Sequence, residues 1–108
     1  MNVSKEYLDD LVKKCDFFIK RKRMCPWTRR SVLEDALWRL NVFPAEDVIK
    51  YFEARAKAAK ATDRLLRKGS QLKLTPIWRE EHRLSNLIAL HIKKWYYRYA
   101  NTPEISNE

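Results

Sequence analysis

The chain has 108 residues, of which 45% are hydrophobic and only one is a glycine. This length fits a single domain with a core of its own, and so few turn formers exclude a sheet of many short strands. Lysine and arginine (23) outnumber aspartate and glutamate (14), and the net charge of +9 favours anionic partners. We therefore predict an all-α single-domain bundle of about four helices, two short and two long, over residues 1–100. A frayed polar tail should follow over residues 101–108.

The first predicted helix runs from about Ser4 to Arg21, because apolar residues recur there every three or four positions. These residues are Leu8, Leu11, Val12, Cys15, Phe18 and Ile19. Ser4 can cap the helix, and the basic run that begins at Lys20 suits its negative C-terminal end. Pro26 disfavours helix at the residue before it, so we predict a connector over residues 24–27.

The second predicted helix runs from about Arg29 to Leu40 and has a regular apolar stripe. Thr28 is a plausible N-cap for this helix, since its hydroxyl can accept a hydrogen bond from a free backbone N–H. Asn41 can end the helix in a left-handed conformation, which asparagine tolerates.

The third predicted helix is long, from about Pro44 to Lys68, and Gly69 should end it. Its middle is rich in alanine, so Ala58 and Ala59 should let another helix approach closely. After a short link, Thr75-Pro76 signals the start of a fourth helix that runs to about Ala100. The residues expected on its core face are Ile77, Leu84, Ile88, Trp95 and Tyr99.

We expect neither a membrane span nor a secretory leader. No apolar run approaches the ~20 residues that cross a bilayer, and Lys13, Lys14 and Asp16 interrupt the first apolar stretch. The two cysteines, Cys15 and Cys25, fit a reducing compartment. These features predict a cytoplasmic protein without a membrane partner.

The strongest functional signal is a basic run around the first connector. Six cations lie there within eleven residues, with an aromatic residue among them: Lys20, Arg21, Lys22, Arg23, Trp27, Arg29 and Arg30. Two helix ends that meet at a tight connector would concentrate these charges at one corner. Cations can then converge on phosphates, and an exposed indole can stack on a base. The alternative is a solvated helix end with Trp27 packed inward.

Two further groups of residues could contact nucleic acid. On the third helix Lys57, Lys60 and Arg64 recur at steps of three and four, so they share a face. On the fourth helix Lys93 and Lys94 lie close to Tyr97, which does not fit the core face. Basic helix faces suit a phosphate backbone, but they are also typical of a solvated surface, and tyrosine is common in protein interfaces as well.

Nothing in the sequence favours catalysis, a metal or a cofactor. His82 and His91 are nine residues apart on one predicted helix, near opposite faces, and with the cysteines they lack zinc-ligand spacing. A single glycine cannot form a glycine-rich phosphate loop.

We therefore predict a small, basic, non-catalytic accessory protein that binds nucleic acid, DNA or RNA, mainly through phosphate contacts. The alternative is a helical protein–protein adaptor or inhibitor, of the kind that phages and mobile elements carry. Basic residues gathered on one face would favour the first. An exposed apolar strip, for example around Trp38 or Tyr97, would favour the second.

Overall fold

The computed structural model describes residues 4–70 and 72–100, and the side chains of the second range through Tyr96. All the elements in these ranges are helical, which confirms the predicted all-α bundle. The helices are α1 (Lys5–Arg21), α2 (Pro26–Thr28), η1 (Arg29–Leu33), α3 (Glu34–Val42), α4 (Ala45–Lys68), η2 (Leu72–Leu74) and α5 (Thr75–Ala100). Because α2, the π-helical turn η1 and α3 follow one another without a break, we call them together the composite helix.

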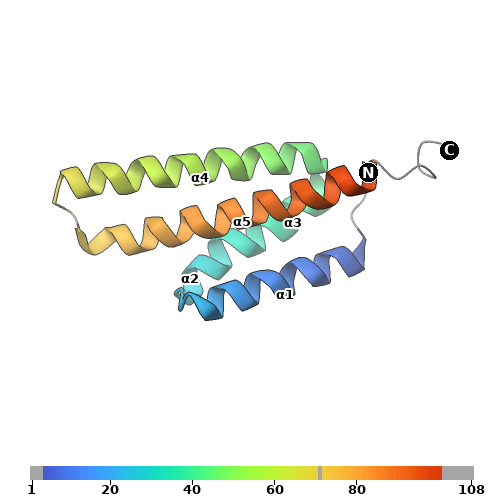
Figure 1. The fold of residues 1–108 in the computed structure, drawn as a ribbon, viewed down its shortest axis with the longest axis horizontal. Coiled ribbons are helices and arrows are strands. Elements are labelled where there is room, and N and C mark those ends of the chain that lie inside the picture. Colours follow the sequence, from blue (N-terminus) through green and yellow to red (C-terminus); the bar gives the residue numbers. More distant parts are fainter. Residues whose placement is uncertain (1–3, 71, 101–108) are drawn as a thin grey trace.

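The bundle is elongated, with principal dimensions of 56 × 23 × 21 Å. Helices α4 and α5 form a long antiparallel hairpin, and α5 lies between α4 and α1 (Figure 1). The hairpin projects at its closed end beyond α1 and the composite helix (Figure 1). One end of the molecule is therefore built from two helices and the rest from four.

Helix α1 begins and ends close to the predicted positions. The Tyr7 N–H donates to the Ser4 hydroxyl oxygen (3.2 Å), which confirms the predicted cap. At the other end Arg23 adopts a left-handed backbone conformation with φ 53°. The Met24 N–H then donates to the Ile19 carbonyl (3.0 Å), as in the Schellman termination of a helix.

The composite helix begins earlier and ends later than the sequence predicts. Pro26 is its first residue, so Thr28 lies inside the helix, where it is buried and does not act as the cap. Asn41 is also helical, and the helix ends at Val42. Phe43 is extended (φ −116°, ψ 157°) because Pro44 follows it and disfavours helix at the preceding residue.

Helix α4 runs to Lys68 as predicted, although Pro44 is its N-cap and not its first residue. Gly69 has a φ of −85° and only extends the last turn. The left-handed residue is Ser70, with φ 63°. The reversal of the chain therefore begins one residue after the glycine.

The core is formed by apolar side chains from α1, the composite helix, α4 and α5. Several of them are fully buried: Leu11, Val32, Leu33, Phe52, Leu84, Ile88 and Ile92. Ile77, which we expected in the core, is exposed; it is in the first turn of α5, and the closed end of the hairpin projects beyond the other helices. Tyr96, in contrast, packs against the core, and the side chain of Tyr99 lies outside the described residues.

The alanines of α4 divide between its two faces. Ala56 and Ala59 are buried, whereas Ala58 is exposed. The expectation of close packing thus holds for Ala59 and is wrong for Ala58, because adjacent helical residues point about 100° apart.

The Ala59→Leu variant should overpack the α4–α5 contact and lower the free energy of unfolding by about 1–3 kcal/mol. The Ala58→Leu variant adds the same side chain to the exposed face and should leave the stability within about 0.5 kcal/mol. Thermal and urea denaturation of the two variants would test this. Equal losses of stability would contradict the described packing of α4.

Candidate nucleic-acid interface

The first connector gathers exposed cations around an exposed tryptophan. Lys20, Lys22, Arg23 and Arg30 are exposed, as is Arg21, which ends α1. The Trp27 side chain is 62% exposed, so the alternative in which it packs inward is wrong. We call these six residues the basic corner. Among the described residues, none of its five cations forms an ion pair.

Arg29 differs from its neighbours because it is bound to two carboxylates. Its Nε donates to Asp16 (2.8 Å), and its terminal nitrogen lies 3.6 Å from Glu34. The hydrogen bond to Asp16 is the main cause of the raised pKa of Arg29. The contact with Asp16 fastens the composite helix to α1. Because Arg29 already pairs with two carboxylates, we do not count it among the cations that are available to phosphates.

A carboxylate from α5 fixes the start of the composite helix. Glu80 Oε1 accepts hydrogen bonds from the Cys25 N–H (3.2 Å) and from the Thr28 hydroxyl (2.7 Å). A negative charge at this point also suits the positive end of a helix. Glu80 thus takes the place of an N-cap side chain, and it fastens the residues on both sides of Trp27 to α5.

Two arginines that sequence reasoning missed extend the basic corner. Arg79 and Arg83 line a small pocket of about 110 Å³ together with Lys22 and Glu80. They are more than fifty positions from Lys22 along the chain, so sequence proximity gave no sign of this contact. The four-residue spacing of Arg79 and Arg83 was the one available signal, because like charges at this spacing repel each other on a helix face.

The predicted residues on α4 form a separate surface. Lys57, Lys60 and Arg64 are all exposed, as expected for the outer face of this helix. Helix α5 lies between α4 and α1, however, and the basic corner is at the C-terminal end of α1 (Figure 1). The two groups of cations therefore do not converge on one ligand-sized site.

The third predicted group lies toward the other end of α1. Lys94 is exposed and lines a pocket with Tyr7 of the first turn of α1 and Lys14 of its middle. Lys93 forms an ion pair with Glu53 of α4 (3.4 Å). The side chain of Tyr97 lies outside the described residues. The structure thus places this group beside the first and middle turns of α1, whereas the basic corner is at the C-terminal end of that helix.

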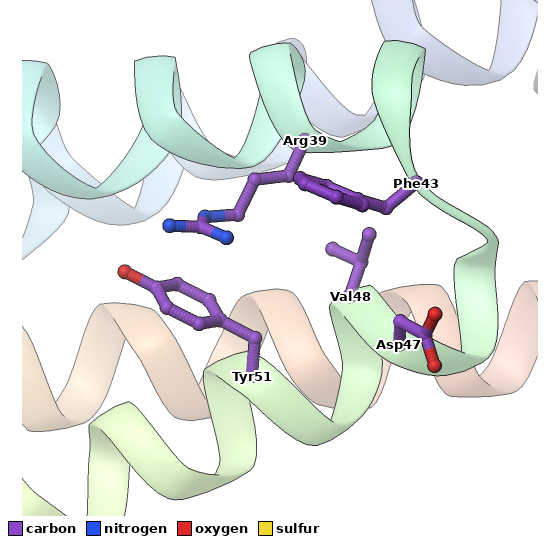
Figure 2. Close-up of a pocket in the computed structure, with 5 residues that line it drawn as sticks. All are labelled: Arg39, Phe43, Asp47, Val48 and Tyr51. Atoms are coloured by element: carbon purple, nitrogen blue, oxygen red, sulfur yellow. The ribbon is translucent and has the colours of Figure 1, made fainter.

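A pocket of about 250 Å³ lies between α3 and α4 (Figure 2). Arg39 lies across it, with its guanidinium carbon 3.5 Å from the centre of the Tyr51 ring. The single Nε–H of Arg39 is shared between the two carboxylate oxygens of Asp35, each at 3.1 Å. Because Arg39 already has a carboxylate and an aromatic ring as partners, this pocket is a weaker site for phosphate than the basic corner. Asp47, on its wall, also disfavours an anion.

The two histidines form hydrogen bonds with residues of other helices, and Cys15 is buried. His82 Nδ1 donates to the Ala56 carbonyl (2.9 Å), and His91 lies between the Tyr7 hydroxyl (3.1 Å) and Asp10 (3.4 Å). Burial is the main cause of the lowered pKa of His91. Burial also raises the pKa of Cys15 to about 12, which keeps its thiol protonated and unreactive at neutral pH.

Searches of family models, of curated proteins and of solved structures returned no match to this chain. In the described part of the chain, no group of three or more His, Cys, Asp or Glu side chains could hold a metal ion. None of the described helices is both long and apolar enough to cross a bilayer. The exposed side chains of the molecule are therefore the basis for inferring what it binds.

We predict that Glu80→Ala destabilises the fold by about 1–3 kcal/mol, because two partly buried donors lose their acceptor. Glu53→Ala is the matched control, since it removes only an exposed ion pair and should cost less than about 1 kcal/mol. Urea denaturation of both variants measures the difference. If Glu80→Ala is no more harmful than Glu53→Ala, Glu80 does not fix the composite helix.

Proposed function

We propose that the protein binds nucleic acid without catalysis, and that the basic corner is its contact surface. The observation that supports this proposal best is the exposure of Trp27 among five cations that have no acidic partner in the described structure. A large exposed aromatic ring at such a place favours a ligand that carries both negative charge and flat rings. Nucleic acids combine these two properties.

The geometry favours single strands or unpaired segments over a regular duplex. An indole can stack only on a base whose face is open, whereas the bases of a duplex are stacked on each other. The cations on both sides of Trp27 could then contact phosphates next to the stacked base. Because backbone contacts and stacking occur with every base, we expect little sequence preference.

The other basic residues have a secondary role in this proposal. Lys57, Lys60 and Arg64 lie on another face, so they cannot contact the nucleotides that stack on Trp27. They still contribute to the net charge of +9, which attracts a polyanion over a distance and accelerates association. Residues of the basic corner should therefore affect the bound complex much more than residues of α4.

The dependence of affinity on salt tests the phosphate contacts. Each contact with a single strand contributes about −0.7 to the log–log slope, so four or five contacts predict a slope of roughly −3 to −3.5. The Lys22→Ala/Arg30→Ala variant should flatten this slope by about 1.4. Fluorescence anisotropy with a labelled mixed-sequence oligonucleotide at several salt concentrations would measure both slopes.

The matched control is the Lys57→Ala/Lys60→Ala variant, which removes the same charge from α4. It should leave the slope nearly unchanged. Equal flattening by the two variants would show that the protein attracts polyanions only through its overall charge. Absence of binding at low salt to single-stranded DNA and RNA alike would overturn the proposal.

Replacement of Trp27 separates base stacking from charge. Trp27→Ala should weaken binding to single strands by about 1–3 kcal/mol, which is typical of a lost stacking contact. Because the side chain is exposed, the melting temperature should hardly change. Trp38→Ala is the control, since Trp38 is 56% exposed on α3 but lies outside the basic corner. Equal losses of affinity in the two variants would contradict the assigned contact.

A further inference from the structure

A second feature of the surface is an apolar groove between α1 and α5. Phe17 of α1 is 67% exposed and Leu90 of α5 is 56% exposed, although both are large apolar side chains. Phe18 and Leu87 are partly buried between the two helices. Pockets of about 290 and 530 Å³ adjoin one another here, and Leu87 and Lys14 line both of them. We call this surface the α1–α5 groove.

Lysines surround the groove on both helices. Lys13 and Lys14 lie on the α1 side, and Lys93 and Lys94 lie on the α5 side. Lys14 pairs with Asp10 (3.7 Å) and Lys93 with Glu53 (3.4 Å). In the described structure Lys13 and Lys94 have no such partner, so the rim of the groove carries an excess of positive charge.

The spacing of the groove residues suits a helical ligand. Along α1 Phe17 and Phe18 each follow a lysine by four positions, and along α5 Leu87, Leu90 and Lys94 follow at steps of three and four. Such rows of side chains form the ridges between which a further helix packs. An amphipathic helix that docks in a groove of this kind buries its own apolar residues at the same spacing.

We propose that the α1–α5 groove binds an amphipathic helical segment of another protein, with acidic residues on both sides of its apolar stripe. Leucine-like side chains of the segment would cover Phe17 and Leu90. Its carboxylates would lie opposite Lys13 and Lys94. The chemistry of the partner is inferred from complementarity. The apolar floor of the groove favours apolar side chains, and the lysines of its rim favour negative charges.

A second copy of this chain is a poorer occupant. Association through the same face would bring the lysine rims of two molecules together, and each molecule carries a net charge of +9. Nucleic acid suits the groove less well, because Phe17, Leu87 and Leu90 form most of its floor and these apolar side chains offer no hydrogen bond to a base. The proposal is independent of the basic corner, since the two surfaces share no residue.

The probe for this groove is a synthetic amphipathic helix of about four turns, with leucine at helical spacing and glutamate on both flanks. Fluorescence anisotropy should show saturable binding to the full-length protein. A peptide of the same composition in scrambled order should bind at least about tenfold more weakly, as should a peptide with lysine in place of glutamate. Comparable binding of the scrambled or the lysine peptide would overturn the proposal.

Variants of the protein then locate the site. Leu90→Gln should weaken binding of the acidic peptide about tenfold, because an apolar contact is lost without a change of charge. Leu65→Gln is the matched control, since Leu65 is also exposed but lies on the projecting part of α4, and it should have no effect. Equal effects would contradict the assignment. Binding to anionic lipid vesicles that depends on Leu90, without binding to the peptide, would also overturn it in favour of a lipid surface.

Discussion

The arrangement of the bundle depends on two adjacent carboxylates of α5. Glu80 accepts hydrogen bonds from the first turn of the composite helix, and Glu81 lies 3.3 Å from Arg55 of α4. Neighbouring residues of a helix point about 100° apart, so the two side chains reach different partners. One turn of α5 is therefore fastened to both of the elements that flank it.

Arg55 extends this constraint to α3. Its guanidinium also lies 2.9 Å from Asp35, and its side chain is only 18% exposed. Burial alone would lower the pKa of Arg55, but the hydrogen bond to Glu81 and the nearby charges of Glu81 and Asp35 raise it. The arginine thus stays charged between two carboxylates from different helices. Loss of either carboxylate would leave a partly buried charge with incomplete pairing, which destabilises the fold.

Much of the fold could be predicted from the sequence, because periodic apolar residues and proline signals are local. The long hairpin helices and α1 were found in this way. The start of the composite helix was not, because its cap comes from Glu80, which is 55 positions from Cys25. Ile77 was misplaced because periodicity identifies an apolar face but does not tell whether another helix covers it. The start of the composite helix and the exposure of Ile77 both depend on how segments that are distant in the sequence pack together.

The candidate binding surfaces, like the fold, could be predicted only in part from the sequence. Exposed cations at Lys20 to Arg23 could be expected from their positions after the last apolar residue of α1. The exposure of Trp27 could not, since an aromatic residue in a connector packs inward as readily as outward. The tertiary structure also removed Arg29 from the set of free cations and added Arg79 and Arg83. In the structure the basic corner, the cations of α4 and the pair Lys93 and Lys94 lie on different parts of the surface. The net charge of the sequence gives no information about this separation.

The central claim is that a nucleic-acid strand contacts the protein at Trp27. The most direct test is ¹⁹F NMR of protein labelled with 5-fluorotryptophan, because the chain has four tryptophans and single Trp→Phe variants can assign their resonances. Titration with a single-stranded oligonucleotide should shift the resonance of Trp27 and leave those of Trp38, Trp78 and Trp95 nearly unchanged. A saturating titration that shifts another tryptophan while Trp27 stays unchanged would contradict the claim.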